Sequence, residues 1–212
     1  MTMSFRINRC GFTLIEMLTV LVIIAILIAV SIPAVTSLMK SGGLTAGVRE
    51  VSNSLSLARQ YAITKRTTTR VLFAYRGSST NGVLLSNLVY VAYSIVATNR
   101  DATTSATSWP YISKWEHLPL GTIFLDNTPP ITGYNLDNDF PKGNFQFPNT
   151  NSPSTASFAY IEFGPTGAAS QSGTITLAEG YIDNTSIPRR PSTNNFANIA
   201  FDNLVGRIAI YR

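Results

Sequence analysis

Residues 11–35 read GFTLIEMLTVLVIIAILIAVSIPAV, and this stretch predicts that the fold begins with a long apolar helix. A short leader with two basic residues, Arg6 and Arg9, precedes it. Glu16 is the only charged residue between Arg9 and Lys40. A carboxylate at the entrance to a long apolar run is costly in a membrane, so we interpret Glu16 as a functional residue.

The apolar run is long enough to cross a membrane. Residues 17–35 carry hydroxyl side chains only at Thr19 and Ser31. A helical rise of about 1.5 Å per residue gives this segment a length of roughly 28 Å, close to the thickness of a hydrocarbon core. The run has no polar face, which argues against a helix that lies on the membrane surface. Because the two leader arginines precede the run and only Lys40 follows it closely, the charge distribution predicts a cytoplasmic N-terminus and an exported C-terminal part.

Three ordinary targeting segments explain less of this sequence. A secretory signal has an apolar core of about 7–15 residues, which is shorter than this run. A lipoprotein signal places its apolar region before the cysteine, whereas Cys10 stands ahead of the run. An ordinary signal anchor would cross the membrane, but it would not account for Gly11, Phe12 and Glu16 together.

Residues 11–16, with basic residues before them and an apolar helix after them, resemble the processing and methylation motif of type IV prepilins and pseudopilins. The resemblance implies that a prepilin peptidase cleaves between Gly11 and Phe12 and then methylates the amino group of Phe12. It also implies that Glu16 acts in assembly, where its carboxylate pairs with the ammonium group of Phe12 on its own or a neighbouring subunit. A carboxylate that only reaches the lipid headgroups is the alternative for Glu16.

The helix is expected to continue into the exported part. Pro33 removes a backbone hydrogen bond and is expected to kink it, and residues 42–43, two glycines, form a second soft point. A membrane helix that ends before a separate soluble helix fits the same residues. Beyond them, apolar residues recur at alternating spacings of three and four, which predicts an amphipathic helix with one buried stripe. The stripe consists of Val48, Val51, Leu55, Ala58 and Ala62.

After Lys65 the chain changes to short segments rich in β-branched and aromatic residues. We expect hairpin connections at 163–167 and 203–206. Long polar loops are expected at 99–108 and 126–157, as surface insertions or as contacts for a neighbour. One helix followed by antiparallel strands predicts an α+β fold. The predicted strands are 70–75, 88–97, 121–125, 159–163, 174–177, 199–201 and 207–211.

The order of these segments is similar to that of the GspH/FimT family of minor pseudopilins. The helix also resembles a pseudopilin type found in Verrucomicrobia-like gene cassettes. The family implies a pilin-like fold, with a long N-terminal helix that is transmembrane in its first half and packs on an antiparallel β-sheet. The similar segments are 57–63, 116–124, 161–167, 173–177 and 205–211. The expected division is a prepilin leader at 1–11, a transmembrane helix at 12–38, an amphipathic helix at 39–66 and a periplasmic β-rich domain at 67–212.

Composition argues for an exported structural domain rather than an enzyme. Charged residues make up 13% of the chain, and the single cysteine, Cys10, lies in the leader, so no disulfide is expected after cleavage. His117 is the only histidine, and no nucleotide-binding loop, nucleophile elbow or zinc helix occurs. We therefore predict no catalytic residue and no cofactor. Asp137 and Asp139 fall short of the six to eight oxygens that Ca²⁺ takes, so no metal site is predicted.

The net charge is +5, and without Arg6 and Arg9 the balance is 14 basic against 11 acidic residues, or +3. DNA-binding minor pilins of the same fold use C-terminal arginines. No aromatic residues for base stacking are clearly interleaved with the basic residues here, so we interpret them as solvated faces and predict no nucleic-acid partner. The basic groups are Lys65, Arg66 and Arg70, then Arg189 and Arg190, then Arg207 and Arg212.

Together these features predict a single-pass inner-membrane protein with its N-terminus in the cytoplasm and its C-terminal domain in the periplasm. After processing it would enter the pseudopilus of a type II secretion-like system. The expected partners are the prepilin peptidase and methyltransferase, other pseudopilins, the inner-membrane assembly platform and membrane lipid. A minor type IV pilin for adhesion, motility or DNA uptake is the alternative, and the sequence leaves both open.

Overall fold

The computed structural model describes residues 13–80, 83–100, 107–125, 136–147, 154–191 and 195–211. The chain divides into two compact units, Met1–Met39 and Lys40–Arg212. The described part of the first unit is helical from Leu14 onward, and the second unit contains the C-terminal part of the same helix and all the described strands.

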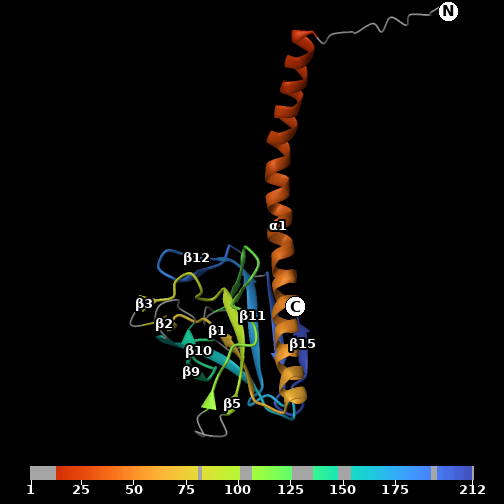
Figure 1. Ribbon diagram of the computed structural model, residues 1–212. Coiled ribbons are helices and arrows are strands. Elements are labelled where there is room, and N and C mark those ends of the chain that lie inside the picture. Colours follow the sequence, from red (N-terminus) through yellow and green to blue (C-terminus); the bar gives the residue numbers. More distant parts are fainter. Residues whose placement is uncertain are drawn as a thin grey trace, which may run out of the picture. The chain divides into compact units, whose positions relative to one another are not determined.

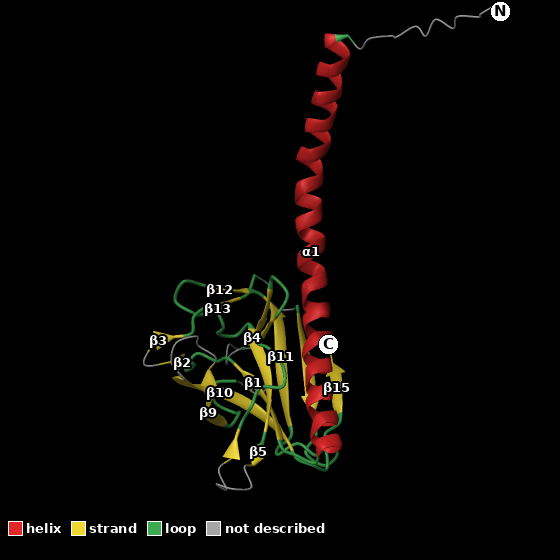
Figure 2. Ribbon diagram, viewed as in Figure 1, coloured by secondary structure: helices red, strands yellow, loops and turns green. Residues whose placement is uncertain are grey.

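The described elements are one helix and fifteen strands. Figures 1 and 2 draw the helix as a coiled ribbon and the strands as arrows. The helix, α1, runs from Leu14 to Lys65. The strands in the first half of the C-terminal unit are β1 (Thr69–Phe73), β2 (Ser79–Thr80), β3 (Val83–Leu84), β4 (Ala92–Ala97), β5 (Asn99–Arg100), β6 (Thr107–Ser108), β7 (Glu116–His117) and β8 (Thr122–Phe124). Those in its second half are β9 (Lys142–Phe147), β10 (Ser154–Phe163), β11 (Gly173–Glu179), β12 (Tyr181–Ile182), β13 (Pro188–Arg189), β14 (Phe196–Phe201) and β15 (Ile208–Tyr211).

Two antiparallel sheets organise the C-terminal unit. The larger sheet has the order β3-β2-β10-β1-β4-β7, with β9 also paired to β10. The smaller sheet has the order β15-β14-β11-β8. Two short ribbons, β12–β13 and β5–β6, complete the pairing among the described strands. The predicted α+β fold, with a helix on antiparallel β-structure, is therefore confirmed.

The C-terminal end of α1 is closed by a Schellman motif. Arg66 adopts φ +49°, the left-handed conformation typical of the residue after a helix. The amide of Thr67 donates to the carbonyl of Ala62 at 3.1 Å, and that of Arg66 donates to the carbonyl of Ile63 at 3.4 Å. These bonds satisfy two carbonyl groups that the helix end would otherwise leave unpaired, and they turn the chain into β1.

The predicted apolar stripe of α1 is buried in the main core. Val48, Val51, Leu55, Ala58 and Ala62 are all at most 2% exposed. They pack against both sheets, because the same core contains apolar side chains of β1 and β10 and of β11 and β14. Those side chains are Val71, Phe73, Ile161, Phe163, Ile175, Leu177, Ile199 and Phe201.

A second core lies on the opposite face of the larger sheet. Leu72 and Val96 point there, since side chains alternate along a strand, and they join Phe145 and Phe158. Trp109 and Trp115, from the segment before β7, are partly buried against this layer. The Trp115 ring lies 4.7 Å from that of Phe158, centroid to centroid.

Three loop predictions were wrong in part, and residues 101–106, 126–135 and 148–153 of the two longer loops lie outside the described residues. Residues 163–167 reverse the chain as expected, with an isolated antiparallel bridge between Phe163 and Ala169, but β10 and β11 belong to different sheets, so this turn carries the chain from one sheet to the other. The described part of the loop predicted at 126–157 contains β9, paired with β10. The loop predicted at 99–108 begins and ends in the paired strands β5 and β6. The hairpin predicted at 203–206 does join β14 to β15.

Candidate functional site

The start of α1 is closed by a capping box. The hydroxyl and the amide of Thr13 both donate to Oε2 of Glu16 at 2.9 Å, and the amide of Glu16 donates to Oγ1 of Thr13 at 3.3 Å. This reciprocal arrangement satisfies amide groups that the first turn of a helix leaves unpaired. The carboxylate also lies at the positive end of the helix dipole. Thr13 was missed in the sequence, although Thr13-x-x-Glu16 is itself the capping-box pattern.

Gly11 and Phe12, the predicted cleavage and methylation residues, lie outside the described residues. So do the side chains of residues 30–41, which include Pro33. The predicted kink at Pro33 therefore stays a prediction, although α1 is a single helix across this position.

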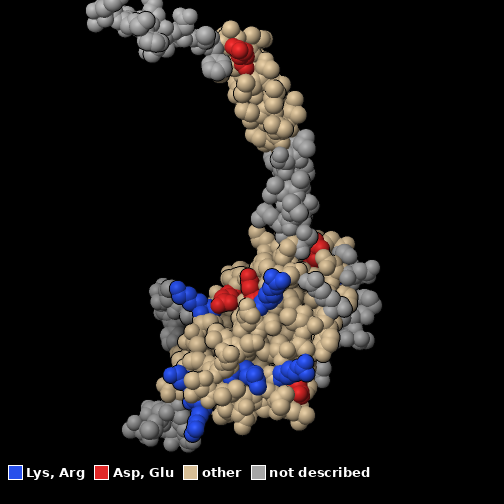
Figure 3. Space-filling model, turned by 90° about the vertical axis from the view of Figure 1, so that its right-hand side faces the viewer, with Lys and Arg blue, Asp and Glu red and all other residues tan. Residues whose placement is uncertain are grey.

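The first turns of α1 expose apolar side chains on all sides. Every described side chain from Leu14 to Ala29 is exposed in the single chain. The hydroxyl of Thr19 donates a hydrogen bond to the carbonyl of Ile15 at 2.8 Å, which satisfies its donor within the helix. Figure 3 shows this segment as uncharged surface with an acidic patch near its start. Within the described residues, no helix is both long and apolar enough to cross a membrane.

Residues 6–32 match the family model described as the prokaryotic N-terminal methylation motif. The chain carries a prepilin-like N-terminus. The matched segment contains Gly11, Phe12, Thr13 and Glu16, so the capping box lies inside the motif.

Among solved structures, the chain is similar to the type IV minor pilin FimU of Pseudomonas aeruginosa strain PAO1. The identity is 9% and the TM-score is 0.43, over 82% of this chain and 92% of that one. This similarity assigns no role to any residue of the present chain. No curated protein matches the sequence.

Two of the basic residues noted in the sequence, Arg70 and Arg189, form ion pairs within the fold. Arg70 is only 21% exposed and forms an ion pair with Glu162, with 2.6 Å between the guanidinium and Oε2. Its guanidinium carbon also lies 3.8 Å from the ring centre of Trp109 and 4.2 Å from that of Tyr160. The interpretation of Arg70 as part of a solvated basic face was therefore wrong, because its charge and its planar face are used within the fold.

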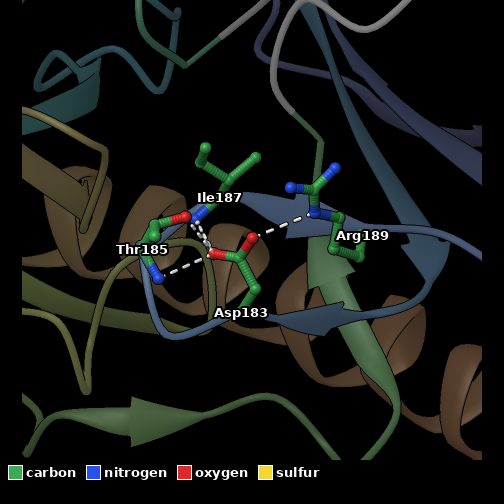
Figure 4. A network of polar contacts seen from close by, with 4 residues as sticks. All are labelled: Asp183, Thr185, Ile187 and Arg189. Atoms are coloured by element: carbon green, nitrogen blue, oxygen red, sulfur yellow. Dashed lines mark hydrogen bonds and ion pairs between the residues drawn. The ribbon is translucent and has the colours of Figure 1, made fainter.

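Arg189 is likewise engaged, in the ribbon of β12 and β13. Oδ1 of Asp183 accepts from the hydroxyl of Thr185 at 2.6 Å and from the amides of Thr185 and Ile187 at 2.9 Å. Oδ2 accepts from Nε of Arg189 at 2.9 Å, as Figure 4 shows. The Thr185 hydroxyl, followed by the Ile187 amide, Arg189 and the Thr185 amide, holds the pKa of Asp183 well below its usual range. The network closes the turn between the two strands.

The remaining polar candidates have structural roles or exposed positions. The carboxylate of Asp137 accepts the hydroxyl of Tyr90, and it also accepts the amide of Arg76 at 3.3 Å. It thus ties two strand connections together. His117 is exposed in β7, at the margin of the larger sheet. Across the described segments, no three His, Cys, Asp or Glu residues are grouped as metal ligands would be.

Proposed function

We propose that the protein is a minor pseudopilin of the GspH/FimT type, a subunit of a short periplasmic pseudopilus in a type II secretion-like system. The prepilin-like N-terminus and the order of the helix and strand segments support this proposal. The action of such a subunit is mechanical: it leaves the membrane, enters a growing rod, and the rod pushes cargo outward.

The observation that carries the proposal is the capped start of α1 inside the methylation motif. Both Thr13 donors use Oε2 of Glu16, and no described residue donates to Oε1. The cap fixes the carboxylate within the first turn, close in sequence to the amino group that cleavage would create at Phe12. We assign Oε1 to that ammonium group, on the same subunit or on a neighbour. In an apolar filament interior this pairing would offset the cost of burying both charges.

In this proposal the protein resides in the inner membrane before assembly. Residues 12–38 would anchor it among lipids, with the leader in the cytoplasm and the C-terminal unit in the periplasm. The prepilin peptidase, the assembly platform and other pseudopilins would be its partners in turn.

Processing is the first test. Mass spectrometry of the membrane-extracted protein is expected to show a chain that begins with N-methylated Phe12. Gly11→Leu should keep the leader, because a bulky residue prevents close approach of the backbone to the peptidase. A chain that still begins at Met1 in cells with an active peptidase would refute the proposal.

Two variants separate the two uses of Glu16. Glu16→Gln keeps an acceptor for Thr13 but removes the charge, whereas Thr13→Val removes the cap and keeps the charge. If the ammonium pairing drives assembly, both variants are processed, Glu16→Gln is largely absent from isolated pseudopili, and Thr13→Val is incorporated. The reverse pattern would show that Glu16 serves the helix start alone.

Deletion of the gene decides between the two kinds of machine. If the protein is a pseudopilin, deletion should remove the secreted proteins from the culture medium and leave twitching and DNA uptake unchanged. Loss of twitching or DNA uptake with normal secretion would identify a minor type IV pilin instead.

A further inference from the structure

The strand β15 is an edge strand of the smaller sheet, and its unpaired side forms an open margin. It pairs with β14 on one side, and no described residue pairs with its backbone on the other. The opposite margin, β8, is at most 2% exposed at each residue and lies against β12. At the edges of the larger sheet, β3 and β7 are two residues long, and β9, which among the described strands pairs with β10 alone, begins with a lysine of the kind that protects a sheet edge. An open margin presents unpaired N–H and C=O groups, and its natural occupant is another extended chain.

The unpaired edge strand β15 exposes large apolar side chains, which is unusual for a sheet edge that nothing covers. Ile210 is 47% exposed and Tyr211 is 59% exposed. The turn that precedes the strand adds Leu204 and Val205, which are 79% and 56% exposed. Proteins commonly protect such margins with charged residues, proline or a covering segment, so an uncovered apolar margin indicates a binding surface.

Hollows lie on both faces of the margin. On the helix side, Ser56, Arg59 and Gln60 of α1 face residues 205–208 across a hollow of about 470 Å³. On the outer face, a hollow of about 420 Å³ extends from β11 across β14 to β15. The small side chains of Ala200 and Ala209 lie in its lining, and Arg207 and Tyr211 border it on the β15 side.

A single strand added beside β15 could reach both hollows, because the side chains of β15 alternate between the two faces of the sheet. Ile208 is opposite Phe201 and packs toward the main core, on the helix side. Ala209 and Tyr211 point to the other face, because side chains alternate along a strand. A strand added beside β15 would alternate in the same way and direct successive side chains toward the two hollows.

The two hollows are lined by two arginines, Arg59 and Arg207, and one acidic residue, Asp202, so the excess of positive charge favours an acidic occupant. Arg59 and Arg207 both line the helix-side hollow, and neither forms an ion pair with a carboxylate among the described residues. Nε of Arg59 donates to the carbonyls of Gly167 and Val205, which leaves its positive charge uncompensated. A second copy of the chain is a poor occupant. The strand is flanked by Arg207 and Arg212 in the sequence, and antiparallel self-pairing would set these like charges opposite each other.

We propose that the open margin of β15 binds an extended segment of a different protein by strand addition, and that this segment alternates apolar residues and carries acidic residues at its ends. The backbone hydrogen bonds would supply affinity, and the two hollows and two arginines would select the side chains. This holds for either kind of filament, so processing at Phe12 and strand binding succeed or fail separately.

The test uses the full chain in detergent and a labelled peptide, acetyl-Glu-Val-Thr-Val-Thr-Val-Glu-amide. Two control peptides replace both glutamates by lysine or the central valine by proline. The Glu peptide is expected to bind about two- to fivefold more tightly than the Lys peptide, the range of one or two cross-strand charge pairs. The Pro peptide should not bind, since it lacks an N–H that a strand must donate. In hydrogen exchange, binding should slow alternate amides of residues 208–211.

Matched variants locate the site. Arg207→Glu should reverse the preference between the Glu and Lys peptides, whereas Arg76→Glu, at another exposed arginine, should leave it unchanged. Tyr211→Ser should weaken binding about threefold or more, given the value of aromatic cross-strand contacts. Tyr181→Ser is the control, because Tyr181 is exposed to nearly the same extent, 61%.

Three results would overturn the proposal. The first is equal binding of the Pro peptide, which would indicate apolar adsorption. The second is peptide binding that protects amides outside β15. The third is concentration-dependent self-association that Tyr211→Ser abolishes, which would make a second copy the occupant.

Discussion

Gly206→Ala tests how the second half of α1 is fastened to the sheets. Gly206 adopts φ +62°, and a Cβ atom built there would lie 2.0 Å from the carbonyl oxygen of Gly167. That oxygen accepts from Nε of Arg59 at 3.1 Å, and the same nitrogen is 3.1 Å from the carbonyl oxygen of Val205. One helix side chain thus joins the turn after β10 to the turn before β15.

The cost of the added methyl group has three parts. A left-handed conformation costs a residue with a Cβ atom about 1–2 kcal/mol. A contact at 2.0 Å with a backbone atom cannot persist, so one of the two turns must shift, and overpacking of this kind costs about 1–3 kcal/mol. The shift would weaken the Arg59 bond to Gly167, which is partly solvated and contributes about 1 kcal/mol. Because the parts overlap, we expect a loss of about 3 kcal/mol in the free energy of unfolding.

Two other glycines provide matched controls. Gly121 also has a positive φ, +82°, but nothing lies within 4 Å of its added Cβ atom, so Gly121→Ala should cost only about 1 kcal/mol. Gly42 lies in α1 with open space around it, and Gly42→Ala should stabilise by about 0.5–1 kcal/mol.

Urea unfolding of the full chain in detergent, followed by tryptophan fluorescence, measures all three variants. The two tryptophans, Trp109 and Trp115, both lie in the C-terminal unit. If Gly206→Ala and Gly121→Ala lose the same free energy within about 0.5 kcal/mol, close to the limit of additivity, then the turn relaxes freely and the fastening argument fails.

Two further predictions concern the polar networks. Asp183→Asn should speed hydrogen exchange at the amides of Thr185 and Ile187 at neutral pH. Because the pKa of Asp183 is lowered in the folded state, its stabilising contribution is present above the unfolded value of about 4 and is lost as pH falls toward the folded value. The exchange rates of these amides in the two proteins should therefore converge in acid. A difference in rate that persists there would contradict the charge argument. Arg70→Lys should cost about 1–2 kcal/mol in urea unfolding, since lysine keeps the charge but loses the planar stacking on Trp109 and Tyr160. Arg189→Lys, at a side chain that is 56% exposed, should cost less than about 0.5 kcal/mol, and equal losses for the two variants would show that stacking adds nothing.

The sequence predicted those parts of the fold that depend on local pattern. The helical stripe was recognisable because one face of α1 meets the core at every third or fourth residue. The strands of the smaller sheet were recognisable because their apolar residues are bounded by turn residues, and the hairpin between β14 and β15 followed from its glycine. The start of α1 was also local, and Thr13 could have been found from its spacing to Glu16.

What could not be predicted depends on contacts between distant segments. Gly164 and Gly167 form a turn in either case, and only the packing of both sheets against α1 decides that the next strand joins the smaller sheet. The strand β9 begins with Lys142, Gly143 and Asn144, which do not favour a strand, so it owes its form to its pairing with β10 rather than to its composition. Arg70 belongs to an aromatic site because Trp109, from the segment before β7, and Tyr160 and Glu162, both from β10, come to it from two distant segments, and no short-range pattern contains them.

The two caps of α1 would stay intact when the subunit moves from the membrane into a filament. Both ends of the helix are closed by bonds within the chain, the Thr13–Glu16 box at the start and the Schellman turn at Arg66. These bonds pair several backbone groups of each end within the chain, so the two capped turns need not unfold when the neighbours of the chain are exchanged. A carboxylate that serves only as a cap could be replaced by glutamine with little effect in any environment. The proposed pairing with Phe12 therefore predicts an effect of Glu16→Gln that appears in assembly and is absent from the helicity of the single chain, which circular dichroism of the processed protein in detergent can measure.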